Sequence, residues 1–298
     1  GEVRKMKRVA FGIAAGLLGL VLPACGEVTE PAPWTVAAEA GAGTPDPAAW
    51  RAVDPANLIV LETSKGRILV EALPEAAPKH FAQFTKLIQS GDLDGTTFHR
   101  VIDDFMAQGG DVWTKMGKDP GWPGIPGEFM FRRDVAAMPW DAVIGPEDTG
   151  RSGYMKGFPM SGQPAFFSEM SVDGLVATFI PHCKGVLSTA RTDDPNSADT
   201  QFFLMREHSP HLDKNYTAWG RVIEGQAVVK ALKKGAPGSG EVTDPDLLTS
   251  IKIAADIPEK SRPKAWVLRT DTDAFKAELA TRGEVDVCEL PAIPAIVK

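Results

Sequence analysis

Arg100 is the residue of this 298-residue chain whose surroundings most clearly indicate a chemical role. It lies in a mostly apolar run, residues 98–111, which closes on Gly109-Gly110-Asp111. Alternate side chains of a strand share a face, so we expect Phe98, Arg100 and Ile102 to point the same way. A guanidinium stays charged and offers several donors, and burying it unpaired is costly. The sequence therefore predicts that Arg100 either pairs with a carboxylate or serves a ligand.

Two further stretches follow this run along the chain. Residues 185–204 read GVLSTARTDDPNSADTQFFL, and residues 211–220 read HLDKNYTAWG. Together with residues 98–111, they resemble the active-site segments of the cyclophilin family of peptidyl-prolyl isomerases, and they occur in the family's order. The resemblance implies an enzyme that rotates X-Pro peptide bonds in proline-containing polypeptides, without a cofactor.

The resemblance also implies a role for each matching residue. Arg100 would donate to the prolyl nitrogen and is the expected catalytic residue. The remaining positions would bind substrate: the pocket for the proline ring (Phe105, Met106, Phe203, Leu212), the positioning amides (Gln108, Gln201), the segment that holds the preceding residue as an extended strand (Ala190, Arg191) and the rim (His211, Tyr216).

Two of these positions depart from the eukaryotic members of the family. His211 stands where those members usually have a tryptophan that contacts cyclosporin, so we expect weak or no cyclosporin binding. Tyr216 replaces a histidine, and the loop between Ala190 and Gln201 is one residue longer. None of these changes affects the proposed donor, Arg100.

Other chemistries have weaker support in the sequence. His99, His208 and His211 do not show the spacing of a metal site, so no metal is expected. No G-x-S-x-G motif is present, which disfavours a hydrolase. The net charge of −7 argues against a nucleic-acid partner. The main alternative is a catalytically weak cyclophilin-like binding module, a chaperone or scaffold for proline-containing chains. A structural protein of the cell envelope is a weaker one.

The N-terminal residues resemble a bacterial export signal. Lys5, Lys7 and Arg8 precede an apolar stretch, residues 9–22, that is short for a membrane span. The signal ends in Leu-Pro-Ala-Cys, which resembles a lipobox, and lipidation of Cys25 would tether the protein to a membrane. We therefore expect a periplasmic, membrane-anchored lipoprotein, although an ordinary signal cut after residues 38–40 would give a soluble periplasmic protein.

The two other cysteines, Cys183 and Cys288, leave two alternatives open. In an oxidising compartment they would form one disulfide between the barrel and the C-terminal segment. Otherwise they would be two buried thiols.

The family resemblance implies a mainly β fold, a closed antiparallel eight-stranded barrel capped by two α-helices, with a long insertion and a C-terminal extension. We divide the chain into the export signal at 1–25, an Ala/Pro/Gly-rich linker at 26–56, the isomerase domain at 57–256 with its insertion-bearing region at 112–184, and the extension at 257–298.

Local patterns predict most elements of this fold. A hairpin is expected over residues 58–73, a helix from Pro78 to Gly91, a second short helix over 225–234 and a final barrel strand over 247–253. In the extension, the pattern predicts strands at 265–268 and 285–290, with a helix between them that begins at Asp271 or Thr272. Trp34 and Trp50 in the linker are candidates for contact with the domain.

The insertion gives no clear pattern. Residues 127–129 and 166–169 both resemble fragments of a family strand, and the sequence does not choose between them. An insertion this long is either functional or decoration. One hypothesis is that it borders the substrate groove and shapes substrate choice.

Overall fold

The computed structural model describes residues 30–37 and 42–298. The expected export signal, Cys25 and part of the expected linker lie outside these residues. Within the described residues, no helix has the length and apolar character needed to cross a bilayer.

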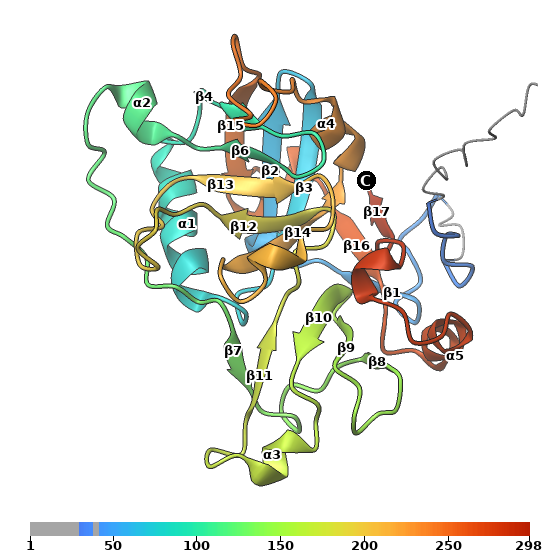
Figure 1. Ribbon diagram of the computed structural model, residues 1–298. Helices are drawn as coiled ribbons and strands as arrows, with labels where there is room; N and C mark the ends of the chain where they lie inside the picture. Colours follow the sequence, from blue (N-terminus) through green and yellow to red (C-terminus); the bar gives the residue numbers. More distant parts are fainter. Residues whose placement is uncertain (1–29, 38–41) are drawn as a thin grey trace, which may run out of the picture. The chain divides into compact units, whose positions relative to one another are not determined.

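A curled antiparallel sheet of nine strands forms the largest part of the molecule (Figure 1). Its order is β4-β15-β2-β3-β14-β12-β13-β6-β5. The strands are β2 (Leu58–Thr63), β3 (Gly66–Ala72), β4 (Thr96–Thr97), β5 (Arg100–Val101), β6 (Met106–Gly109), β12 (Val186–Thr189), β13 (Phe202–Met205), β14 (Ala218–Glu224) and β15 (Leu247–Ile253).

The mainly β, barrel-like prediction is confirmed, but the strand count and the closure differ slightly. The sheet has nine strands rather than eight, and β4 and β5 form its two edges. Both edge strands are only two residues long, and Arg100 makes one isolated bridge to Glu241 beyond the edge. A short edge offers few unpaired backbone groups to another chain.

Two helices cover the sheet, as expected. α1 (Pro78–Ser90) begins with proline at its first turn, and Gly91 ends it with φ +81°. Its buried face packs on the sheet, where the rings of Phe84 and Trp219 lie 5.1 Å apart. The second helix is α4 (Gln226–Ala231).

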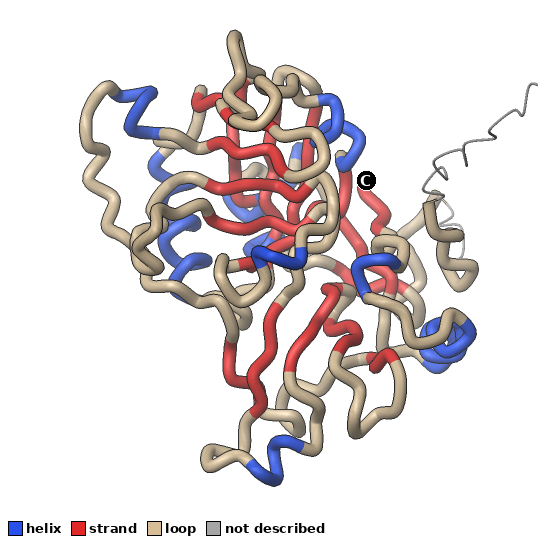
Figure 2. Tube along the Cα trace, viewed as in Figure 1, coloured by secondary structure: helices blue, strands red, loops and turns tan. Residues whose placement is uncertain are grey.

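A second group of elements lies beside this sheet (Figure 2). It contains a three-stranded sheet in the order β1-β16-β17 and a five-stranded sheet in the order β7-β11-β10-β9-β8. The strands are β1 (Trp50–Ala52), β16 (Ala265–Leu268), β17 (Ala295–Val297), β7 (Phe131–Arg133), β8 (Ala142–Ile144), β9 (Ser152–Met155), β10 (Phe158–Gly162) and β11 (Val176–Phe179). The remaining helices are α2 (Val112–Met116), α3 (Phe167–Met170), α5 (Asp273–Thr281) and the 3-10 turns η1 (Pro55–Asn57), η2 (Pro210–Leu212), η3 (Ala254–Asp256), η4 (Glu259–Ser261) and η5 (Val287–Glu289).

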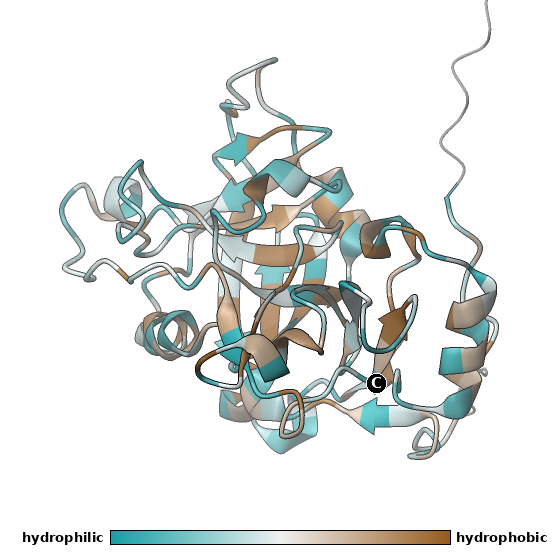
Figure 3. Ribbon diagram, turned by 60° about the horizontal axis from the view of Figure 1, so that its bottom comes forward, coloured by the Kyte–Doolittle hydropathy of each residue, from teal (hydrophilic) through white to brown (hydrophobic). Residues whose placement is uncertain are grey.

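The described residues of the expected linker, the insertion-bearing region and the C-terminal extension share one apolar core. The ring of Trp34 lies 4.8 Å from that of Phe275 on α5 and 6.2 Å, edge-on, from that of Tyr154 on β9. Trp50 is also buried, and its strand β1 pairs with β16. Many of the apolar residues that form the cores lie in the strands (Figure 3). The described part of the expected linker is therefore packed, since two tryptophans bury large apolar areas there.

Most local predictions in the extension are confirmed. Residues 265–268 form β16, and Thr272 caps α5 by accepting a hydrogen bond from the Phe275 N–H. The strand predicted at 285–290 is wrong, because Asp286 accepts from the Cys288 N–H and caps the turn η5 instead.

The predicted alternation around Arg100 is also wrong. Phe98 and Val101 both enter the core under α1, whereas Ile102 packs against the other core. Strand β5 is only two residues long, so the alternation of a longer strand does not apply.

Cys183 and Cys288 are joined by a disulfide, with 4.8 Å between their Cα atoms. The bond links the loop before β12 to η5. It closes a separation of 105 residues in the sequence.

Glu278 on α5 connects the N-terminal residues to the extension. It accepts hydrogen bonds from the backbone N–H of Thr35 and Val36 at 2.9 Å and from Arg282 at 2.8 Å. Burial would raise the pKa of Glu278, but these donors outweigh it and lower the pKa from 4.5 to about 2. A carboxylate whose pKa is lowered by folding stabilises the folded state above its unfolded pKa.

We predict that Glu278→Gln lowers the free energy of unfolding by about 2 kcal/mol at pH 7. The wild type should lose this contribution as the pH falls from 4.5 towards 2, whereas the variant should not. Urea unfolding at several pH values measures both, with Glu284→Gln at an exposed glutamate as the control. Parallel pH profiles of wild type and Glu278→Gln would contradict the prediction.

Candidate functional site

Arg100 lies at the edge of the curled sheet, with its side chain held by two neutral acceptors. Its Nε donates to the Ser239 carbonyl at 3.0 Å, and its Nη1 donates to Gln108 Oε1 at 3.3 Å. Gln108 Nε2 in turn donates to Gln201 Oε1 at 2.8 Å. This chain of side-chain amides fixes one edge of a half-buried guanidinium and leaves its positive charge without a carboxylate among the described residues.

The register of the strands brings these groups to one face. Arg100 lies opposite Gln108 across β5 and β6, and Gln108 lies opposite Phe203 across β6 and β13. Opposed residues of an antiparallel ladder project to the same side. Met106 lies two residues before Gln108 and therefore shares its face.

Gly240 lets the loop that carries Ser239 approach this edge. Its φ is +73°, and a Cβ there would lie 2.4 Å from Ile102 Cγ1. Only glycine fits both conditions without a shift of the loop or of Ile102.

Four apolar side chains of the expected proline pocket pack in one core cluster. Met106, Phe203 and Leu212 are buried within one core cluster, and Phe105 packs against it. The ring of Phe105 lies 5.4 Å from the exposed His211. The site therefore combines a fixed cation with neighbouring apolar side chains.

The next part of the site is an aromatic and cationic stack. Phe203 contacts Tyr216 edge-on at 5.9 Å, and the guanidinium of Arg191 lies 4.6 Å from the Tyr216 ring. The same guanidinium lies 5.4 Å from the ring of Phe129. Ala190 N–H donates to the Gln201 carbonyl at 2.9 Å, which fixes the start of the loop.

Phe129 belongs to the insertion-bearing region, and its neighbour Glu128 attaches it to α1. Glu128 accepts from the backbone N–H groups of Lys79 and His80 and lies 2.7 Å from His80 Nδ1. Burial would raise the pKa of Glu128, but these hydrogen bonds lower it overall. Of the two strand-like fragments, residues 127–129 thus lie at the site, whereas Phe167–Met170 form α3 at the far end of the insertion (Figure 1).

The sequence analysis missed a buried polar group behind Phe203. His182 stacks on the Phe203 ring at 6.2 Å, its Nδ1 lies 2.9 Å from Asp213 Oδ1, and its Nε2 lies 2.9 Å from Ser188 Oγ. Ser188 is fully buried and donates to the Thr217 carbonyl, so it is not an accessible nucleophile. The sequence signal for this group is weak, because Asp213 lies 31 residues after His182 and no motif links the two.

The structure thus brings Arg100, the two glutamines and the residues of the expected pocket together. His99 and His211 are not part of any potential metal cluster in the described residues, and His208 lies apart from this site beside Asp286 and Cys288.

Comparison with known proteins agrees with this geometry. Residues 58–254 match the family model of the cyclophilin type peptidyl-prolyl cis-trans isomerase/CLD. A protein of Brucella abortus (strain 2308), described as a probable peptidyl-prolyl cis-trans isomerase, is 36% identical over 207 residues, which are 69% of this chain and 86% of that protein. A peptidyl-prolyl cis-trans isomerase of Synechococcus elongatus is 30% identical over 201 residues, or 66% and 96% of the two chains.

A solved structure extends the similarity beyond the family model. The crystal structure of cyclophilin AquaCyp293 from Hirschia baltica is 43% identical, with a TM-score of 0.79. The match covers 85% of this chain and 94% of the chain of that structure. The matched residues, the curled sheet and the site around Arg100 agree: this chain belongs to the cyclophilin family of peptidyl-prolyl cis-trans isomerases.

Proposed function

We propose that this isomerase accelerates X-Pro rotation in proteins folding in the cell envelope, with Arg100 as the donor to the prolyl nitrogen. The observation that carries the proposal is the guanidinium of Arg100, held by the Ser239 carbonyl and Gln108 beside an apolar surface. No covalent intermediate is required, because the reaction is rotation about one bond.

A hydrogen-bond donor directed at the prolyl nitrogen lowers the barrier to rotation about the X-Pro bond. Amide resonance sets a rotation barrier of about 18–20 kcal/mol. As the bond twists, the prolyl nitrogen becomes pyramidal, and a donor that binds its lone pair stabilises the twisted state. An arginine suits this role because it stays charged and its donors are rigidly arranged.

The free energy of one hydrogen bond sets how much Arg100 adds to the rate of rotation. A hydrogen bond to a charged group is worth about 1.5–3 kcal/mol, and each 1.36 kcal/mol is about tenfold in rate. The donor alone therefore supplies roughly ten- to two-hundredfold. Any further acceleration comes from preorganisation, which the fixed Gln108–Gln201 pair and the buried Phe203 provide.

The location is proposed from the N-terminal sequence alone. The basic and apolar residues before Cys25 support export and lipidation, which would tether the enzyme to a membrane. Mass spectrometry of the membrane fraction tests this, and an unmodified or absent Cys25 would contradict it.

We also propose that the insertion shapes substrate choice through Phe129. The Arg191 guanidinium lies over both the Phe129 ring and the Tyr216 ring. Arg191 follows Ala190, the position proposed to hold the residue before the proline. The orientation of Arg191 thus affects which side chains fit at that position.

We predict that Arg100→Ala lowers kcat/KM for an Ala-Pro peptide by about 10–200-fold, because the donor is lost. Arg100→Lys should retain part of the activity, since it keeps the charge but loses the planar donor arrangement. Arg67→Ala, which removes an exposed ion pair with Glu224, is the matched control. If Arg100→Ala folds and retains full activity, the proposed role is wrong. If wild type binds the peptide without accelerating its isomerisation, the domain is a binding module.

We predict that Phe129→Ala changes kcat/KM severalfold for peptides that differ in the residue before proline, with little effect on an Ala-Pro peptide. The physical reason is that Arg191 loses one of its two stacking partners, worth about 0.5–1 kcal/mol at an exposed site. Phe166→Ala, at an exposed phenylalanine near α3, is the control. Identical preferences in wild type and Phe129→Ala would argue against a role of the insertion in specificity.

A further inference from the structure

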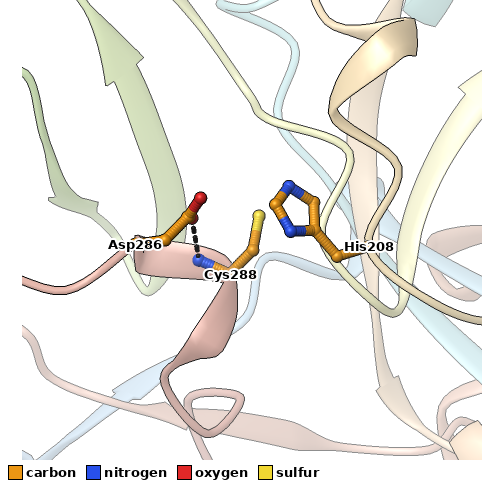
Figure 4. Close-up of side chains that lie close together, drawn as sticks. All are labelled: His208, Asp286 and Cys288. Atoms are coloured by element: carbon orange, nitrogen blue, oxygen red, sulfur yellow. Dashed lines mark hydrogen bonds between the residues drawn. The ribbon is translucent and has the colours of Figure 1, made fainter.

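His208, Asp286 and Cys288 lie together (Figure 4), and Cys288 is one of the two cysteines of the disulfide. The ring nitrogen, carboxylate oxygen and sulfur that each offers are within 4.8 Å of one another. The partner of Cys288 in the disulfide is Cys183, which supplies a second sulfur at the same place. The cluster therefore contains two sulfurs, one imidazole and one carboxylate, and none of these groups belongs to the site around Arg100.

The surrounding fold positions these residues independently of the disulfide. The His208 loop is held by Ser209, whose N–H donates to the His182 carbonyl at 3.1 Å. Cys183 follows His182 directly and is itself buried, 7% exposed. On the other side, Val287 is buried in the same core, and Asp286 fixes the backbone of Cys288 at 2.8 Å. We therefore expect the four side chains to remain close when the disulfide is open.

We propose that the thiol form of this protein binds one Zn²⁺ ion through Cys183, Cys288, His208 and Asp286. Two thiolates, an imidazole and a carboxylate are ligands that tetrahedral zinc accepts. Bond lengths of about 2.0–2.3 Å place the ligand atoms of such a site about 3.6 Å apart. The ligand atoms of His208, Asp286 and Cys288 lie within 4.8 Å of one another, so side-chain shifts of about 1 Å bring these three to coordinating distance. The Cys183 sulfur, now bonded to that of Cys288, moves away from it once the disulfide is reduced.

The cluster is partly exposed to solvent, so a metal ion can reach it. Asp286 is exposed, and His208 and Cys288 are half-buried. One oxygen of Asp286 accepts from the Cys288 N–H, and the carboxylate has a second oxygen to offer. Cys183 is buried, and its sulfur is bonded to that of Cys288 in the disulfide.

Metal binding and the disulfide exclude each other. Zinc binding is not a redox step: the two thiols release two protons, and the thiolates bind the metal. The disulfide closes by exchange with an external disulfide oxidant. Both cysteine sulfurs are then oxidised, the oxidant becomes a dithiol, and Zn²⁺ is released. A dithiol reductant reverses these changes. The zinc form is therefore restricted to the protein before the disulfide closes or after it is reduced.

The test is a Co²⁺ titration of the full-length protein, reduced with a phosphine under inert gas. We expect a thiolate-to-Co²⁺ absorption band that saturates at one equivalent and disappears on addition of Zn²⁺. The disulfide-bonded protein should show no such band, because its sulfurs are not thiolates. Absence of a stoichiometric band in the reduced wild type would overturn the proposal.

Variants separate a four-ligand site from binding by the cysteines alone. His208→Ala should weaken Zn²⁺ affinity at least tenfold. Asp286→Asn should also weaken it while it keeps the acceptor that caps Cys288. His211→Ala, at an exposed histidine three residues away, should bind like wild type. Circular dichroism of the reduced proteins checks folding. If His208→Ala and Asp286→Asn both bind as tightly as wild type, the assigned site is wrong.

Discussion

Among the described residues, only neutral groups hold the Arg100 guanidinium in the proposed active site, and the proposed mechanism depends on this constraint. A carboxylate partner would neutralise the cation and compete with a substrate for its donors. Here a backbone carbonyl and a glutamine amide orient it instead, and the Gln108–Gln201 hydrogen bond orients that amide. The charge thus stays available beside the apolar surface of Phe203. The cost of partly burying a cation is offset by these hydrogen bonds.

The sheet and the loops around it serve this geometry. Strand register places Arg100, Gln108 and Phe203 side by side on three neighbouring strands. Buried His182 and Ser188 pack behind Phe203 and form hydrogen bonds with each other. In the proposed mechanism a flexible pocket would lose much of the effect of Arg100, since the donor is directed at a nitrogen that is only transiently pyramidal.

The sequence predicted what depends on local pattern and on motif. The hairpin of β2 and β3, the helix α1 with its Gly91 end, the strand β16 and the Thr272 cap of α5 all follow from nearby residues. Contacts between distant segments were not predictable in this way. Trp34 packs on Phe275, which is 241 positions later, and Phe129 reaches Arg191 across the insertion. The contact of His182 with Asp213 was missed for the same reason. The turn η5 was predicted as a strand because only the folded backbone shows that Asp286 caps it.

The most direct test of this account is NMR exchange spectroscopy of an Ala-Pro peptide with wild type and Gln108→Ala. The account predicts that wild type accelerates cis–trans exchange. It also predicts that Gln108→Ala exchanges the bound peptide several-fold more slowly, because Arg100 then keeps only the Ser239 carbonyl of its two acceptors. Gln89→Ala, at an exposed glutamine of α1, should behave like wild type. Unchanged exchange in a folded Gln108→Ala variant would contradict the claim that the attachment of Arg100 determines catalysis.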